Sequence, residues 1–229
     1  MPRIEDVSTN GPRRDARANS DRILSAATDV FARRGLGATL ADVAAAAGVG
    51  VGSVYRRYAN KDDLIYEVYA ERVHATEELA REASEASEVW AGFVRFFEET
   101  IRDMAGDRGL RELTIGGFTE SIGWARGSAP ERLADLIDEN HGAMGVYLTT
   151  LTDRAKATGL LRADFHPTDM MLLSLAVQST IDFGGAERPE LYRRVLTFVL
   201  DGLAPDPAGA TPLPEPPLTE SELLSIRRR

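Results

Sequence analysis

The chain has 229 residues, a hydrophobic content of 43% and a formal net charge of −9 at pH 7, as expected for a globular protein of one large or two small domains. It contains no cysteine, which excludes disulfides, cysteine-ligated metals and a thiol nucleophile. Residues 1–20 are polar and charged, and no segment approaches 18 consecutive apolar residues. We therefore expect a cytoplasmic protein without a signal peptide or membrane span.

The charge is distributed unevenly along the chain. Residues 1–61 carry ten Arg or Lys and six Asp or Glu, a net charge of +4, whereas the remainder carries 17 and 30, a net charge of −13. A basic segment attached to an acidic body is one indication of nucleic-acid binding, although +4 is modest.

Three short helices are predicted before a long one. The apolar residues of "SDRILSAATDVFARRG", from Ile23 to Phe31, recur at helical spacing, and Gly35 follows as a helix stop. Thr39 can cap a second, alanine-rich helix that Gly48 ends. A third helix then spans 51–58, because Asn60 can cap a fourth.

The glycine-rich run in "AGVGVGSVYRRYANK" raises two alternatives, a phosphate-binding loop of an enzyme or the turn of a DNA-binding motif. A dinucleotide fingerprint requires three glycines directly after a β-strand, but Ser53 stands at the third position and a helix precedes the run. No glycine precedes a Lys-Ser or Lys-Thr pair, so a P-loop is also absent. Helix, glycine turn and helix together indicate a helix-turn-helix, which places its second helix in the major groove.

From Arg22 to about Val68 the chain resembles the DNA-binding domain of the TetR (tetracycline-repressor-like) transcriptional regulators. The resemblance is carried by "RILSAATDVFARRG", "ATLADVA", "AAGVGVGSVYRRY" and "NKDDL". It implies an all-α protein, with an N-terminal three-helix helix-turn-helix domain at residues 20–66 and a helical ligand-binding and dimerisation domain at 67–204. The DNA-binding residues that we expect on this basis are Thr39, Val51, Gly52, Ser53, Tyr55, Arg56, Arg57 and Lys61.

The residues themselves support several of these roles. Gly52 permits close approach of the backbone to the duplex, and Val51 suits a thymine methyl group. Lys61 opposes the helix macrodipole, which suggests a nearby anion. Tyr55 has the alternative of a buried core ring, and a solvated helix end is an alternative for one member of the pair Arg56 and Arg57.

Other positions change the DNA contacts that we expect. Tyr58 stands where the family usually has Phe, and we expect it to pack in the core. Gly50 and Ala41 lack the hydrogen-bonding side chains that relatives use there, which leaves fewer groups to specify the DNA sequence. Residues 1–19 are expected to form a basic, flexible arm, with Arg13, Arg14 and Arg17 reaching the minor groove.

The body is predicted to be entirely helical, with helices at 62–83, 88–105, 107–125, 129–158, 167–183 and 189–203. In the family such helices enclose a small-molecule pocket, whose candidate lining residues here are Trp90, Phe93, Phe97, Phe118, Trp124, Met144 and Tyr147. Each has plain core packing as an alternative. We expect a hydrophobic or amphipathic effector, with Asp138, His141 or Gln178 as polar contacts.

The last two predicted helices are apolar over much of their circumference, which predicts a partner surface. The resemblance implies a homodimer through residues 167–203. Residues 205–229 then form a proline-rich linker and a short terminal helix, for which Thr219 and Glu222 supply a capping box.

Nothing in the sequence indicates an enzyme, a metal site or a cofactor, because the three histidines lack ligand spacing and no nucleophile elbow is present. We therefore expect double-stranded DNA and a small molecule as partners, and a dimeric repressor that binds a (pseudo)palindromic operator and that a ligand releases. The alternative keeps the DNA-binding domain but makes the body a dimerisation or protein-interaction module without a ligand.

Overall fold

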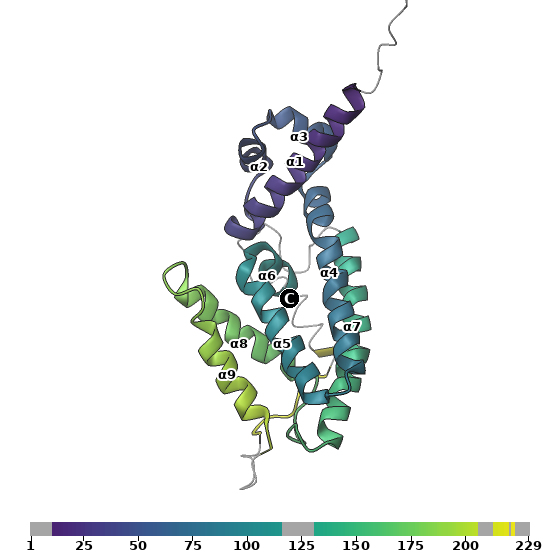
Figure 1. Cartoon of the computed structure of the whole chain (residues 1–229), viewed down its shortest axis with the longest axis vertical. Coiled ribbons are helices and arrows are strands. Elements are labelled where there is room, and N and C mark those ends of the chain that lie inside the picture. Colours follow the sequence, from purple (N-terminus) through teal and green to yellow (C-terminus); the bar gives the residue numbers. More distant parts are fainter. Residues whose placement is uncertain (1–10, 116–130, 206–212, 220, 223–229) are drawn as a thin grey trace, which may run out of the picture.

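A computed structural model describes residues 11–115, 131–205, 213–219 and 221–222, and every regular element within these ranges is a helix, as the sequence predicts. The molecule is elongated (Figure 1). Helices α1 (Gly11–Arg34), α2 (Leu40–Ala47) and α3 (Val51–Arg57) gather at one end, and α4 (Lys61–Glu85) runs from that end into the body.

Helix α1 begins at Gly11 rather than near Ser20, so residues 11–19 are helical instead of forming the expected flexible arm. Pro12 lies in the first turn, where a missing N–H costs no helical hydrogen bond, and the residues after it are mostly good helix formers. Arg17 is exposed on this helix. Residues 1–10 and the side chains of Arg13 and Arg14 lie outside the described part of the chain.

Local caps set the ends of the next helices. The Thr39 hydroxyl accepts a hydrogen bond from the Asp42 backbone N–H at 3.1 Å, and the Asp42 carboxylate accepts one from the Thr39 N–H at 2.8 Å, a complete capping box at the start of α2. Gly48 ends α2 with φ of +65°, a left-handed conformation that favours glycine. At the start of α4, Asn60 accepts from the Asp63 N–H at 2.8 Å.

Within the described residues, the body consists of α4 and five further helices. These are α5 (Val89–Gly106), α6 (Arg108–Ile115), α7 (Glu131–Ala157), α8 (Asp169–Gly184) and α9 (Tyr192–Leu203). Helices α4 and α7 pack side by side along the body, and α8 and α9 form a hairpin on the other side of α5 (Figure 1). The predicted helix at 107–125 is described only as far as Ile115.

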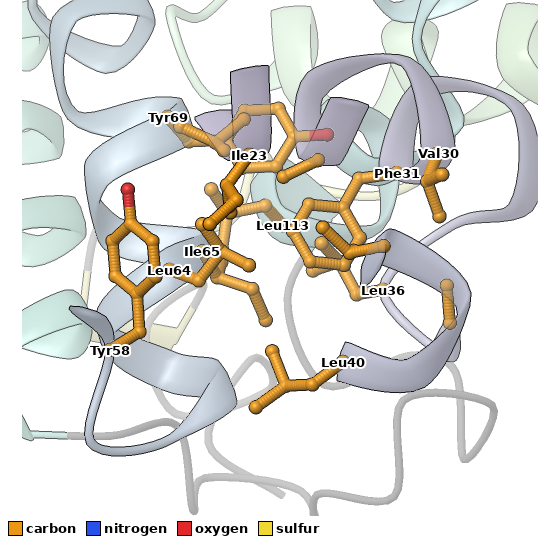
Figure 2. Close-up of a cluster of buried hydrophobic side chains, with 14 of the residues drawn as sticks. Ile23, Val30, Phe31, Leu36, Leu40, Tyr58, Leu64, Ile65, Tyr69 and Leu113 are labelled. Carbon is orange, nitrogen blue, oxygen red and sulfur yellow. The ribbon is translucent and has the colours of Figure 1, made fainter. Parts of the chain in front are cut away.

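Two groups of buried apolar side chains stabilise the molecule. One fills the space between α1, α2, α3 and α4 (Figure 2), and it also includes Leu110 and Leu113 of α6 and Leu136 of α7. The other lies between the C-terminal part of α4 and helices α5, α7, α8 and α9. Helix α6 therefore closes the core of the helix-turn-helix end.

The C-terminal segment returns to the start of α8. The Thr168 hydroxyl donates to the Leu218 carbonyl at 2.9 Å. The predicted capping box is present, since Glu222 accepts from the Thr219 N–H at 2.8 Å and Thr219 accepts from the Glu222 N–H at 3.2 Å. Residues 213–219 are not helical, in line with their proline content, and residues 221 and 222 are.

Candidate DNA-binding surface and ligand cavity

The outer face of α3 carries the residues that sequence analysis assigned to DNA. Val54 is fully buried and anchors the helix, so the residues on its opposite side face outward. Val51 is 44% exposed and Tyr55 is 56% exposed, which excludes the core position that was an alternative for Tyr55. Gly52 and Arg56 are exposed beside them.

Gly50 and Gly52 leave space around the backbone of this face. A Cβ added at Gly50 would meet nothing within 4 Å, and one added at Gly52 would meet only the Arg56 guanidinium at 3.6 Å. Packing within the chain therefore does not require glycine at either position. Gly50 precedes α3 without a side-chain cap, as its lack of a side chain predicts.

The two arginines at the end of α3 have different surroundings. Arg56 donates to the Ser53 hydroxyl at 2.9 Å, and both side chains remain on the outer face. Arg57 donates to Ser20 of α1 at 2.9 Å and to the Glu67 carboxylate of α4 at 3.1 Å. The guanidinium of Arg57 thus ties α3 to its neighbours, a role that the sequence did not indicate.

Tyr58 and Lys61 lie where α3 passes into α4. Tyr58 is 2% exposed, which confirms the prediction of core packing. Burial raises the pKa of its phenol. Lys61 is half-buried at the first position of α4, and loss of hydration lowers the pKa of its ammonium group, while the carboxylates of Asp62 and Glu112 oppose this shift.

Thr39 is exposed at the start of α2, and its hydroxyl is engaged in the capping box. A short hydrogen bond of 2.6 Å joins Arg34 to the same Asp42 carboxylate. The hydrogen bonds from Thr39, followed by that from Arg34, lower the pKa of Asp42 to about 2. The carboxylate therefore stays ionised at neutral pH, and the cap remains intact.

A cavity of about 550 Å³ opens in the body between α4, α5, α6, α7 and α8. This volume is in the range of sites that take drug-sized ligands. Most of its wall is apolar, and its lining includes Phe97, Met104, Leu110, Leu113, Met144 and Met170. The cavity is lined by residues of both cores, for example Leu113 of the core at the helix-turn-helix end and Phe97 of the core of the body.

Only part of the aromatic set expected for the ligand site lines this cavity. Phe97 and Met144 do. Trp90, Phe93 and Tyr147 do not. Phe93 is fully buried and stacks on Trp90 with ring centroids 5.4 Å apart, at the N-terminal part of α5, and Tyr147 packs against the core of the body. Phe118 and Trp124 lie outside the described residues.

Buried polar side chains interrupt the apolar wall of the cavity. Gln178 of α8 is 3% exposed, and its amide nitrogen contacts the Met104 sulfur at 2.8 Å. The Gln178 carbonyl oxygen and the Thr100 hydroxyl are buried without a hydrogen-bond partner in the described structure. His141 also lines the cavity, with Nδ1 2.6 Å from the Ile137 carbonyl, whereas Asp138 is exposed and lies away from it.

Helix α6 carries a chain of buried contacts from the cavity to the helix-turn-helix end. On its inner side, Leu110 and Leu113 line the cavity and also belong to the core of that end. On its outer side, the buried Glu112 carboxylate accepts from the Leu36 backbone N–H at 2.7 Å and from Arg108 at 2.8 Å. Leu36 belongs to the turn between α1 and α2, so α6 contacts this turn directly.

The start of α6 is held by a second buried carboxylate. Asp107 accepts from the Tyr69 hydroxyl and from the Leu110 N–H, each at 2.9 Å, and pairs with Arg72. Burial, followed by the charge of Asp107, raises the pKa of the Tyr69 phenol, which therefore remains a hydrogen-bond donor. The sequence does not single out Asp107 and Glu112, because their partners Tyr69, Arg72 and Leu36 are distant in the chain.

Two further observations concern the residues that the structure describes. No group of three or more His, Asp or Glu side chains in the described ranges is arranged to hold a metal ion. No helix in these ranges is both long and apolar enough to cross a membrane.

Two family models match segments of this chain. The model described as "Bacterial regulatory proteins, tetR family" matches residues 23–68, and the model described as "Transcriptional regulator SbtR-like, C-terminal domain" matches residues 90–205. Among curated proteins, no sequence gives a significant match.

Solved structures of similar fold agree with these matches. A TetR transcription regulatory protein from Mycobacterium vanbaalenii is 27% identical, with 84% of this chain and 98% of that chain covered and a TM-score of 0.50. A TetR transcriptional regulator from Streptomyces coelicolor is 25% identical, with 81% and 98% covered and a TM-score of 0.53. FadR from Bacillus subtilis, solved with stearoyl-CoA, shares the fold at 17% identity, with 80% and 99% covered and a TM-score of 0.54.

The two matched segments together span most of the chain, and they correspond to the helix-turn-helix end and to the body that holds the cavity. The chain therefore belongs to the TetR family of DNA-binding transcriptional regulators.

Proposed function

We propose that this protein is a dimeric repressor that binds a (pseudo)palindromic operator through α3 and releases it when a small molecule enters the cavity of the body. The observation that carries the proposal is the position of Leu110 and Leu113. They line the cavity and belong to the buried core of the helix-turn-helix end. A ligand that displaces them changes the packing on which the orientation of α3 depends.

The DNA-binding part of the proposal uses the exposed face of α3. Val51 and Tyr55 are apolar or aromatic and exposed, and Arg56 lies beside them on the same face. Open space at Gly52 allows the backbone to approach the duplex closely. The half-buried Lys61, whose charge is costly in the free protein, gains a partner when a DNA phosphate lies near it.

Dimerisation is supported by an exposed apolar surface on the α8 and α9 hairpin. Leu172 and Phe183 are 43% and 86% exposed on α8, and Phe198 is 66% exposed on α9. Exposed aromatic side chains on two adjacent helices are typical of a protein interface. A twofold partner across residues 167–203 would cover them and set the distance between two α3 helices, which must match about one turn of DNA, roughly 34 to 36 Å.

The DNA-binding test uses an operator fragment that the protein itself selects from random duplexes. Replacing Tyr55 and Lys61 together by Ala should weaken binding to all duplexes and reduce the slope of log K against log salt by about 1. Arg95→Ala, an equal loss of charge on the exposed face of α5, is the control. If the double variant binds like the parent in a mobility-shift titration, the assignment of α3 is wrong.

The ligand test follows the same operator complex. Compounds that raise the melting temperature of the protein should also weaken its operator affinity, by about 5- to 150-fold, the range usual for coupled sites. Compounds that bind in the cavity and leave DNA affinity unchanged would contradict release by a ligand. That result would favour a body that serves dimerisation or protein interaction alone.

A further inference from the structure

We infer that the cavity selects an uncharged amphipathic molecule whose polar end is a hydroxyl or N–H group bound by Gln178 and Thr100. This inference names the ligand class for the proposed function and rests on it for the regulatory effect. The binding itself is a property of the body and can be measured without DNA.

Gln178 lines the cavity and carries a buried acceptor that has no hydrogen-bond partner in the described structure. The side chain is 97% buried, its amide nitrogen is held against the Met104 sulfur at 2.8 Å, and its carbonyl oxygen has no hydrogen-bond partner. Buried polar atoms are nearly always paired, because an unpaired one loses its hydration without compensation. A ligand donor is the group that would satisfy this oxygen.

Thr100 adds a second polar atom on the same wall. It lies on α5 one helical turn before Met104, about 6 Å along the axis, and Met104 is the residue that Gln178 contacts. Its buried hydroxyl also lacks a partner in the described structure, and a hydroxyl can both donate and accept. Gln178 and Thr100, on the part of the wall formed by α8 and α5, therefore each lack a partner that a ligand hydroxyl would supply.

The charges around the cavity disfavour an anionic ligand. No lysine or arginine is among the described residues that line the cavity, and its titratable lining residues are the exposed Asp103 and two histidines, His141 and His166. A carboxylate or phosphate at the Gln178 end would be buried without a lysine or arginine of the cavity wall to pair with, which is costly. The remaining wall, with Phe97, Met104 and Met170, suits an apolar body.

Three probes of similar shape distinguish an uncharged polar ligand from an apolar and from an anionic one. They are 4-butylphenol, butylbenzene and 4-butylbenzoate, and their binding is measured by calorimetry at pH 7.5. We expect the phenol to bind about tenfold more tightly than butylbenzene, the ratio for one satisfied buried polar group. The benzoate should bind more weakly than the phenol. Equal affinity for phenol and butylbenzene, tighter binding of the benzoate, or no binding of any probe would overturn the inference.

Substitutions test whether Gln178 supplies the preference. Gln178→Leu should remove the tenfold advantage of the phenol while retaining butylbenzene binding. Ser174→Ala, one turn earlier on α8 and also on the cavity wall, is the matched control, because its hydroxyl already donates to the Met170 carbonyl at 2.7 Å. A preference for phenol that survives in Gln178→Leu, or that is lost in Ser174→Ala as well, would show that Gln178 does not select the ligand.

Operator binding in the presence of 4-butylphenol tests the proposed release of the operator separately from the inferred ligand class. If the phenol binds through Gln178 but leaves operator affinity unchanged, ligand release is wrong while the ligand class stands. If the benzoate binds more tightly and releases the operator, the proposed function stands and the inference about ligand class is wrong.

Discussion

A close contact between the body and the helix-turn-helix end is made by two residues, Gly35 and Glu112. Gly35 has φ of +77° directly after α1, and a Cβ added there would lie 2.5 Å from the Glu112 carboxylate oxygens. The backbone can come this close to a buried carboxylate only because the residue lacks a side chain. The absence of a side chain at Gly35 thus lets Glu112 reach the Leu36 N–H.

Gly35→Ala should destabilise the protein more than Gly48→Ala does. Both positions have positive φ, so each substitution costs about 1 to 2 kcal/mol of backbone strain. A Cβ at Gly48 meets nothing within 4 Å, whereas one at Gly35 overlaps Glu112. Urea unfolding measures the free energy of unfolding of both variants. Equal decreases would show that the Glu112 side chain moves away from the new Cβ at no cost in stability.

Asp42 makes the start of α2 dependent on acidity. Its pKa is lowered from 3.8 to about 2 by the hydrogen bonds from Thr39 and then by Arg34. A lowered pKa in the folded state contributes stability above the unfolded value, and this contribution is lost as the pH falls from about 4 to about 2. The stability difference between the parent and Asp42→Asn should therefore be largest above pH 4 and shrink toward pH 2. A difference that is constant over this range, measured by urea unfolding, would contradict the prediction.

At the scale of elements, α8 and α9 each carry two different apolar faces. Leu196 of α9 is 5% exposed and belongs to the core of the body, whereas Phe198 two residues later is 66% exposed. On α8, Val177 is fully buried and Phe183 is 86% exposed. The apolar side chains that the sequence places around these helices therefore fall into two sets. One set packs in the core of a single chain, and the other forms the surface that we propose for the dimer.

Phe183→Asp combined with Phe198→Asp should yield a folded monomer, because both side chains are exposed in the single chain and would be buried only in the dimer. Leu196→Asp should instead unfold the protein, since a charge in the core lacks a partner. Light scattering measures the mass, and circular dichroism measures the helix content. A dimeric double variant would place the interface elsewhere.

At the scale of the whole molecule, α6 connects the cavity with the helix-turn-helix end. Its inner residues line the cavity, and Glu112 on its outer side accepts from the Leu36 N–H. If a ligand weakens operator binding as proposed, the operator must weaken ligand binding by the same factor, because coupling between two sites is reciprocal. A substitution on α6 can then change this factor without touching either binding surface.

Glu112→Gln should reduce the factor by which a cavity ligand weakens operator affinity. The amide cannot replace a carboxylate that accepts from both Leu36 and Arg108, so the contact between α6 and the α1–α2 turn is weakened. Glu99→Gln, which alters an exposed ion pair on α5, is the control. The measurement is operator affinity with and without ligand. An unchanged ratio in Glu112→Gln would show that the signal takes another path.

The sequence by itself determined the helix-turn-helix end and the order of the helices. Thr39, Gly48 and Asn60 act on backbone groups within a few residues, so their roles are fixed locally and can be recognised from spacing. The start of α1 was misjudged, because a proline in a first turn is as compatible with a helix as with an extended arm.

Only the tertiary structure decided which residues surround the cavity and how α6 contacts the DNA-binding end. Phe93 and Phe97 lie on the same helix, yet Phe97 lines the cavity and Phe93 packs against Trp90. Gln178 and Met104 are 74 positions apart, and Glu112 and Leu36 are 76 apart. Helical periodicity defines the face on which a side chain lies, but the neighbour of that face depends on how distant helices cross. These contacts exist only once the chain has folded.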